Sequence, residues 1–240
     1  MLDALQRLIL NRYTPASFDA PTGPATSNLL PKLGREWVET LRGRTVADFG
    51  CGHGVECEEL AAVAGRVVGI DSEPNARAIA NLRTSHLANV RITDHLDEPV
   101  DAIISIDSFE HFSDPAAILA TMVKALQPGG CVLVSFGPTW YHPLGGHLFS
   151  VFPWAHLIFS EQALMRWRAQ HRTDGARRFG DVEGGLNRMT IHRFKTLCNA
   201  SGLDVAHFEA VPINSLRALH SPLTEEFTTA LVRAYLVKRG

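Results

Sequence analysis

Residues 46–54, Val-Ala-Asp-Phe-Gly-Cys-Gly-His-Gly, constrain the fold of this chain more than any other stretch. An apolar run ends at Asp48, and glycines then alternate at Gly50, Gly52 and Gly54. Because glycine has no Cβ, it adopts positive φ easily and lets a ligand lie against bare main chain. A strand that turns through such a loop into a helix is typical of a nucleotide-binding α/β unit.

The glycine spacing distinguishes between two kinds of nucleotide. The dinucleotide pattern G-x-G-x-x-G/A needs a third small residue, which allows close packing of helix on strand. Counted from Gly50, that position holds Val55, which disfavours a nicotinamide-dependent oxidoreductase. A second apolar run, residues 66–70, ends at Asp71, about 20 residues further on, where a ribose-binding carboxylate is expected. The sequence therefore predicts a nucleoside site of a different class.

These motifs, taken in order, resemble the class I S-adenosylmethionine-dependent methyltransferases. The D-x-G-x-G-x-G loop and the acid that follows it are similar to the first two motifs of that family. Residues 101–112 resemble its fourth strand, with the pair Glu110 and His111 that is common in its small-molecule branch. Residues 126–134 resemble its turn into the fifth strand, so the resemblance covers residues 44–136.

The resemblance implies that the cofactor is S-adenosyl-L-methionine. Main-chain amides of the glycine loop would carry its methionine portion, Asp48 would orient the loop or contact the ammonium, and Asp71 would bind the ribose hydroxyls. The predicted cofactor-binding residues are Asp48, Gly50, Cys51, Gly52, Gly54, Asp71, Ser72, Asp94, His95, Ile106 and Asp107. Asp94 is preferred over Asp97 for the adenine contact, and helix capping or a solvated surface is the alternative role of these acids.

Alternating apolar segments predict an α/β fold with a doubly wound, seven-stranded Rossmann-like sheet. The expected strands are 44–49, 66–70, 90–93, 101–106, 131–136, 203–211 and 230–237, mostly parallel, and the resemblance implies an antiparallel final strand. Helices are expected at 32–42, 55–64, from Pro74, from Pro115 after an N-cap at Asp114, after Ser160, and at 190–200.

The domain organisation expected from this pattern is a single domain over residues 1–240 without a second core. Residues 1–43 would form an N-terminal helix and lid region, with a proline-rich loop at 14–31. Residues 137–189 interrupt the alternation and would form an inserted substrate cap.

Composition excludes several other classes of protein. Of the 240 residues, 45% are hydrophobic and 20% charged, as in ordinary soluble domains. A formal net charge of −2 gives no support for nucleic-acid binding. The chain shows neither a signal-peptide pattern nor an apolar run near 18 residues, so we expect a cytoplasmic protein without a membrane partner. Its four cysteines form no C-x-x-C pair, so no zinc site is expected, and a homodimer is left open.

The predicted cap contains three histidines, His142, His147 and His156, set among large aromatic residues. A hydroxyl acceptor must lose its proton as it takes a methyl group, and a histidine with a pKa near 6.5 suits that task. His147 is the first candidate for the base, followed by His142 and His111. The alternatives are simple packing within the cap or a metal site, but the spacing matches no familiar ligand pattern, so no metal is expected.

The acceptor is expected to be a small molecule methylated at oxygen. Asp107-Ser108-Phe109 follows the fourth strand, where enzymes that methylate amino groups of nucleobases carry Asn/Asp-Pro-Pro-Tyr/Phe. Several arginines between residues 166 and 178 would bind an anionic group of the acceptor or form a solvated helix face, and Asn187 and Arg188 are further pocket candidates. Methylation of nitrogen or carbon, or a non-catalytic cofactor-binding protein, remain alternative functions.

Overall fold

The computed structural model describes residues 2–13, 26–149, 151–173, 175–182 and 185–239, so most of the predicted proline-rich loop lies outside the described residues. The strands are β1 (Thr45–Phe49), β2 (Arg66–Ile70), β3 (Val90–Thr93), β4 (Val100–Ile106), β5 (Leu126–Phe136), β6 (Leu203–Pro212) and β7 (Thr229–Lys238). The α-helices are α1 (Leu2–Leu10), α2 (Leu29–Leu33), α3 (Arg35–Glu39), α4 (Val55–Leu60), α5 (Pro74–Thr84), α6 (Pro115–Ala125), α7 (Ala155–Ile158), α8 (Glu161–Arg168), α9 (Ile191–Ala200) and α10 (Glu225–Thr228). Short 3₁₀ turns span His147–Phe149, Phe179–Asp181 and Asn214–Leu219.

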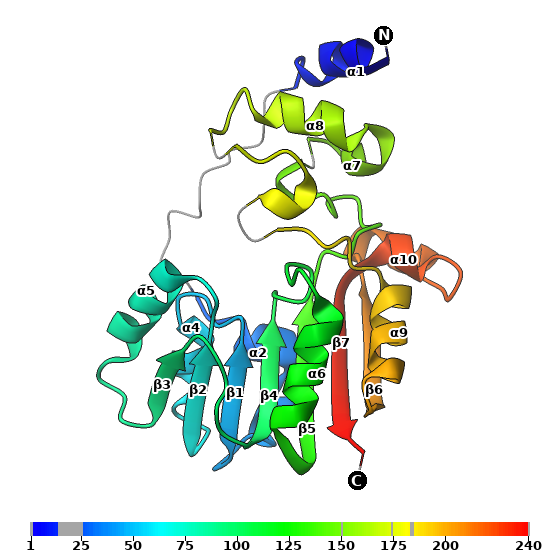
Figure 1. The fold of residues 1–240 in the computed structure, drawn as a ribbon. Helices are drawn as coiled ribbons and strands as arrows, with labels where there is room; N and C mark the ends of the chain where they lie inside the picture. The colour runs from blue at the N-terminus through cyan, green and yellow to red at the C-terminus, as the bar shows by residue number, and fades with distance from the viewer. Residues whose placement is uncertain (1, 14–25, 150, 174, 183–184, 240) are drawn as a thin grey trace.

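The strands form one seven-stranded sheet in the order β3-β2-β1-β4-β5-β7-β6. Strands β1 to β5 pair with one another in parallel, and β7 runs antiparallel between β5 and β6 (Figure 1). This confirms the predicted α/β class and the mixed Rossmann-like sheet. Because the parallel strands share one direction, their carboxyl ends meet at the edge of the sheet that faces the cap.

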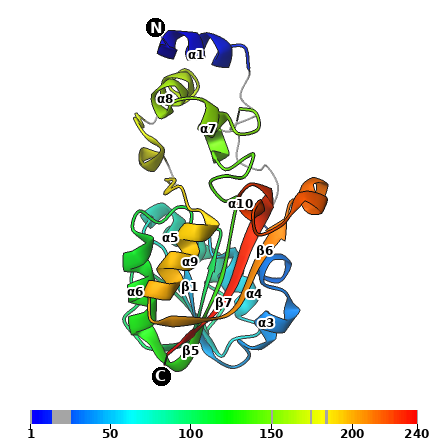
Figure 2. The ribbon, with the colours of Figure 1, turned by 90° about the vertical axis from the view of Figure 1, so that its right-hand side faces the viewer.

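Helices cover both faces of this sheet, as Figure 2 shows from the side. Buried residues of α2, α3 and α4 pack on one face, and those of α6 and α9 pack on the other. The central strands are buried on both faces; Ile103 and Ile104 of β4, for example, have no exposed surface. Such strands have continuous apolar sequences, which explains why they could be predicted from the sequence.

Local sequence signals predicted several helix ends correctly and one wrongly. The side chains of Asp114 and Ser160 accept hydrogen bonds from the amides of Ala117 and Ala163, at 3.0 and 3.2 Å, which confirms both predicted N-caps. The single helix predicted at 32–42 is wrong. Gly34 has φ 80° and ψ 154°, so the chain turns there and divides the segment into α2 and α3.

The cap has a hydrophobic core of its own, so the expectation of no second core is wrong. Leu10 of α1 is buried there with Phe149, Trp167 and Phe179, and α1 packs against α8. The range 1–43, predicted as one lid region, is therefore divided: α1 lies with the cap, whereas α2 and α3 lie on the sheet (Figure 1). The aromatic residues that pack this core are not spaced periodically in the sequence, so the sequence did not predict it.

Candidate active site

The glycine loop after β1 is held against the adjacent strand by its main chain. The amides of Gly50 and Cys51 donate to the carbonyl of Ile70 at the end of β2, at 2.8 and 3.0 Å. Gly50 has φ 82°, and a Cβ at this position would lie 2.7 Å from the Cβ of Ser108. Only glycine satisfies both conditions, which brings the β1 loop close to the end of β4.

The next part of the loop has free space above bare main chain. Gly52 has φ 51°, and a Cβ there would meet no atom within 4 Å. Its amide donates to Oδ2 of Asp71 at 2.9 Å, while Oδ1 accepts from the amide of Glu73 at 2.9 Å. A half-buried carboxylate thus stands beside an open glycine cradle, a donor set and shape that fit an adenosyl cofactor.

Asp48 lies behind the loop, 2% exposed. The Sγ of Cys57, on α4, donates to Oδ2 of Asp48 at 3.4 Å. Burial, followed by the charge of Glu56, raises the pKa of Asp48 to about 8. Of its two predicted roles, this burial favours support of the loop over contact with a ligand ammonium. Gly54 begins α4 with φ 76°, and a Cβ there would lie 2.9 Å from that of Ala80.

Asp107 follows Ile106, the buried last residue of β4, and has φ 52°. Its carboxylate forms an ion pair with Lys32 of α2 and accepts from Nδ2 of Asn28 at 3.3 Å. The amide of Asn28 also donates to Glu56 at 2.9 Å. These contacts hold the segment before α2 over the carboxyl ends of β1 and β4, so Lys32 and Asn28 border the candidate site.

The predicted adenine contacts lie at the outer strand β3 and are more exposed. The side chains of Asp94 and His95 are 57% and 70% exposed and hydrogen-bond each other, which lowers the pKa of Asp94. Arg77 links this loop to the ribose side: Nη1 donates to the carbonyls of Asp71 and Ser72 at 2.8 Å, and Nη2 lies 4.0 Å from Asp94. Asp94 thus lies next to the Asp71 loop, whereas Ser72 is exposed.

The turn after β4 contacts the glycine loop and carries His111, one of the candidate histidines. Ser108 begins this turn, and its hydroxyl lies 3.3 Å from the carbonyl of Gly50 and 3.0 Å from that of Ile106, either of which can accept its hydrogen. Three residues later, Nδ1 of His111 donates to the carbonyl of Gly185 at 2.7 Å, which leaves Nε2 as an acceptor. The ring of His147, which has φ 48°, lies edge-on to that of His111, with 5.3 Å between ring centroids.

His147 itself is largely buried. Nε2 lies 3.4 Å from the carbonyl of Pro138, and burial, followed by the nearby His111, lowers the pKa of His147 to about 4. His142 lies apart from this pair, because Nδ1 accepts the amide of Leu144 at 2.9 Å within its own turn. The structure therefore pairs His111 with His147 and not with His142.

A narrow crevice lies where the cap meets the ends of β4 and β5. Glu110, Trp140, His147 and Arg188 are among its lining residues. Glu110 is 3% exposed; Oε1 accepts the amide of Gly137 at 3.3 Å, and Oε2 has no partner among the described residues. Burial, and to a lesser degree Asp107, raises the pKa of Glu110 to about 8. A neutral carboxylic acid therefore lines this crevice at neutral pH.

Asn187 and Arg188, where the cap rejoins the sheet, lie beside this crevice. The guanidinium of Arg188 lies 5.3 Å from the ring centres of both Trp140 and Phe179 and pairs with Glu161. Nδ2 of Asn187 donates to the carbonyls of Phe109 and Phe112, at 2.6 and 2.8 Å, and thereby holds the turn that carries His111. Asn187 thus supports the histidine pair from outside the crevice.

No group of three or more His, Cys, Asp or Glu residues within the described ranges is arranged to hold a metal ion. The ring of His156 instead lies 4.7 Å from that of Trp140, and Nε2 hydrogen-bonds the Trp140 carbonyl at 2.6 Å. The third cap histidine is therefore engaged in packing the cap.

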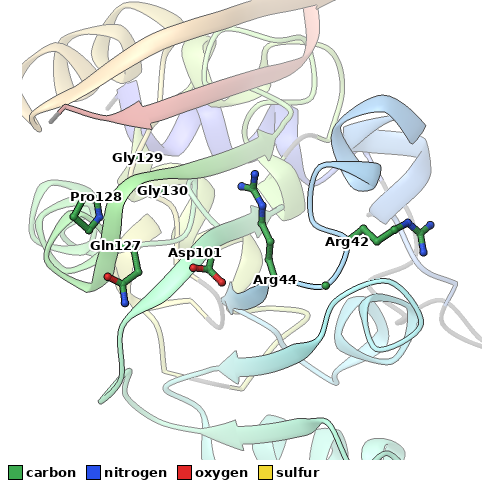
Figure 3. Close-up of a pocket in the computed structure, with 8 residues that line it drawn as sticks. Arg42, Arg44, Asp101, Gln127, Pro128, Gly129 and Gly130 are labelled. Carbon is green, nitrogen blue, oxygen red and sulfur yellow. The ribbon is translucent and has the colours of Figure 1, made fainter.

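A separate hollow lies at the opposite edge of the sheet, where β1 and β4 begin (Figure 3). Arg42, Arg44, Asp101 and residues 127–130 line it. Asp101 there accepts the amide of Thr45 at 2.9 Å. The sheet separates this hollow from the glycine loop, so the two are distinct.

Comparison with known proteins identifies the class to which this fold and loop belong. A family model described as a methyltransferase domain matches residues 25–207, most of the chain. The chain belongs to this family, the class I S-adenosylmethionine-dependent methyltransferases, whose cofactor is S-adenosylmethionine. The recognition of that class and its cofactor from the sequence is confirmed.

Individual relatives are more distant. A ubiquinone biosynthesis O-methyltransferase from Hydrogenovibrio crunogenus is 32% identical over 107 residues, which are 40% of this chain and 44% of that protein. An uncharacterized methyltransferase from Mycobacterium marinum is 26% identical over 180 residues, 69% of this chain and 66% of that protein. The chain thus spans less than two thirds of the length of either relative.

A solved structure shares the fold across nearly the whole chain. The S-adenosylmethionine-dependent methyltransferase from Mesorhizobium loti matches with a TM-score of 0.59 at 18% identity, covering 88% of this chain and 98% of that one. At this identity the likeness establishes the fold.

Sequence reasoning missed several residues of the site. Asn28 lies within the proline-rich stretch and Lys32 directly follows it, so neither carries a motif, and Arg77 resembles any exposed helix residue. Glu110 was recognised only as half of a pair, because its burial and unpartnered oxygen depend on the cap. Asn187 and Arg188, by contrast, were named as candidates from their position at the end of the cap.

Proposed function

We propose that this protein transfers a methyl group from S-adenosylmethionine to a hydroxyl oxygen of a small molecule. The observation that carries the proposal is the contact of the glycine loop with the turn that carries His111. The hydroxyl of Ser108, in that turn, lies 3.3 Å from the carbonyl of Gly50, next to the open Gly52, and the ring of His111 contacts that of His147. Cofactor and acceptor groups would therefore face each other across the turn after β4.

The chain's contribution to the cofactor is binding and orientation. Amides around Gly52 and the carboxylate of Asp71 would hold the amino-acid and ribose portions, and Asp107 would border the sulfur. When bound, the cofactor supplies a methyl group on a cationic sulfur that leaves as a neutral thioether. Because displacement is in line, fixing the acceptor oxygen opposite the S–CH₃ bond supplies much of the rate.

His111 is the residue we propose as the base, in place of His147, the first candidate from the sequence. Its Nδ1–H is committed to the Gly185 carbonyl, so Nε2 holds a lone pair ready for a proton. His147, with its pKa lowered to about 4, is a weak base at neutral pH. Nε2 of His111 would take the hydroxyl proton as the oxygen bonds to the methyl carbon, and His147 would hold the ring in place.

The side chains that line the crevice beneath the cap favour a small, partly apolar acceptor. Trp140, Leu186 and Met189 supply apolar walls, while Glu110 supplies a neutral donor and Arg188 a cation at the rim. The Hydrogenovibrio relative is named as an O-methyltransferase, which supports oxygen as the acceptor atom. We therefore propose an uncharged or anionic hydroxyl compound over a protein or nucleic acid.

The test is methyl transfer from S-[methyl-³H]-adenosylmethionine to a panel of hydroxyl, amine and carboxylate compounds. We expect label on oxygen, and His111→Ala should lower kcat by about 100-fold or more with little change in cofactor affinity. His147→Ala should lower kcat less. Label on nitrogen or carbon would overturn the oxygen assignment, and cofactor binding without transfer to any compound would favour a binding protein.

A further inference from the structure

Helix α1 turns its apolar side chains away from the molecule. Leu5, Leu8 and Ile9 are 55%, 59% and 40% exposed, although α1 packs on α8. A surface helix ordinarily buries its apolar stripe. The inward contacts of α1 are partly polar instead: Gln6 accepts from the hydroxyl of Ser160 at 2.9 Å, beside the buried Leu10.

The outward residues form one surface. Leu5, Leu8 and Ile9 are spaced by three and four residues and are neighbours on the helix, and the exposed Arg12 follows Leu8 by four. We call these residues the outer cap patch: Leu5, Leu8, Ile9 and Arg12.

The patch lies at an extremity of the molecule. Figures 1 and 2 both place α1 beyond α8, at the opposite end from the C-terminus. Other exposed apolar side chains, such as Leu82 of α5 and Leu223 before α10, are far away in the fold. A gathered apolar surface marks an interaction site, whereas isolated residues do not.

Charge decides which partner fits this surface. Residues 1–13 and 137–189 hold eight arginines against five acidic residues, in a chain whose net charge is −2. Two copies related by a twofold axis would bring two regions of net positive charge together, which is unfavourable. An anionic surface attracts them, and a helix with Leu and Ile on its outer face and arginines nearby is typical of one that lies in the bilayer interface.

We propose that the outer cap patch docks on an anionic phospholipid bilayer, with α1 lying among the headgroups. The contact is peripheral, since within the described part of the chain no helix has the length and apolar character to cross a bilayer. It differs from the absence of a membrane partner expected from the sequence, which rested on the lack of a signal-peptide pattern and of a spanning segment. It also goes beyond the proposed methyl transfer and does not depend on it.

The test is sedimentation of the full chain with vesicles of phosphatidylcholine alone or mixed with phosphatidylglycerol. We expect binding to the anionic vesicles that weakens with salt, because the attraction is electrostatic. The variant Leu5→Ser/Leu8→Ser/Ile9→Ser should bind at least about tenfold more weakly, since burial of those side chains is lost. Arg12→Glu, which leaves the apolar residues in place, should also weaken binding.

The matched control is Ile79→Ser/Leu82→Ser/Leu223→Ser, which removes three exposed apolar side chains elsewhere and should bind as the wild type does. Thermal unfolding by circular dichroism should show the same Tm in all four proteins. Three results would overturn the proposal: no binding to anionic vesicles, an equal loss in the control variant, or a dimer in light scattering that only the α1 variant dissolves.

Discussion

The sheet and the cap are built by different means. The body, residues 26–136 and 190–239, has seven hydrogen-bonded strands and places the cofactor loop on main-chain contacts. The cap, α1 with residues 137–189, contains no strand among its described residues and is packed through aromatic rings, such as Phe149 on Phe179 at 4.7 Å. The body, built on main-chain contacts, carries the glycine loop that we propose binds the cofactor. The cap, packed through side chains, carries residues that we propose contact the acceptor.

The largest expected effect compares the two cores directly. Trp167 of the cap and Phe194 of the body are each 1% exposed, so replacing either with Ala should cost about 3–5 kcal/mol of local stability. We expect Phe194→Ala to lower the stability of the body and its affinity for S-adenosylhomocysteine. Trp167→Ala should leave that affinity unchanged and lower only methyl transfer. Denaturant unfolding with calorimetric titration measures both, and identical behaviour of the two variants would show one shared core.

A smaller effect tests whether the body depends on close backbone contact. Gly50→Ala should cost about 2–5 kcal/mol, from positive φ and from overlap with Ser108. Gly129→Ala is the matched control, since its φ is 72° and a Cβ there meets no atom within 4 Å. We expect the control variant to lose only the stability that a positive φ costs, about 1–2 kcal/mol. Equal losses by chemical denaturation would mean that the contact with Ser108 is unimportant.

Two titratable groups at the junction of body and cap, Glu110 and His147, should make the free energy of unfolding depend on pH in opposite senses. Glu110 keeps its proton in the folded state up to about pH 8, whereas the unfolded carboxyl loses it near 4.5. The folded state binds more protons in that window, so stability should fall as pH rises through it. Glu110→Gln keeps the Oε1 acceptor and should reduce this fall by about 2 kcal/mol. An unchanged slope in urea titrations would mean that Glu110 ionises normally.

His147, in the cap, should change the free energy of unfolding at acidic pH. The pKa of His147 falls from 6.5 to about 4 on folding, so the unfolded state binds more protons between these values. Stability should therefore be lost as pH falls from 6.5 toward 4, and His147→Gln should lessen that loss by about 1–2 kcal/mol. His142→Gln, a cap residue outside the pair, is the comparison, and a larger effect there would contradict the assignment.

The sequence predicted the body well because its signals are local. Apolar runs located all seven strands, and the glycines at 50, 52 and 54 located the loop, since positive φ at each position demands that residue. The prediction of one helix at 32–42 failed because Gly34, which divides the segment, is a single unfavourable residue within an otherwise helical stretch of sequence.

The cap could not be predicted in the same way. Its contacts join residues distant in sequence, such as His111 with Gly185 or Gln6 with Ser160, and no periodicity records them. The choice between His111 and His147 depends on burial and on one carbonyl, neither of which a sequence displays. The outward turn of the apolar residues of α1 likewise depends on where α8 lies.

Calorimetric titration of Asp71→Ala with S-adenosylhomocysteine tests most directly whether the carboxyl edge of the sheet holds the cofactor. We expect the wild type to bind and this variant to lose about 1.5–3 kcal/mol of binding free energy, because a charged hydrogen-bond acceptor is removed. Asp94→Ala, whose side chain is 57% exposed, should lose far less. No binding to the wild type at millimolar ligand, or equal affinity of Asp71→Ala and the wild type, would contradict a cofactor site at Gly52 and Asp71.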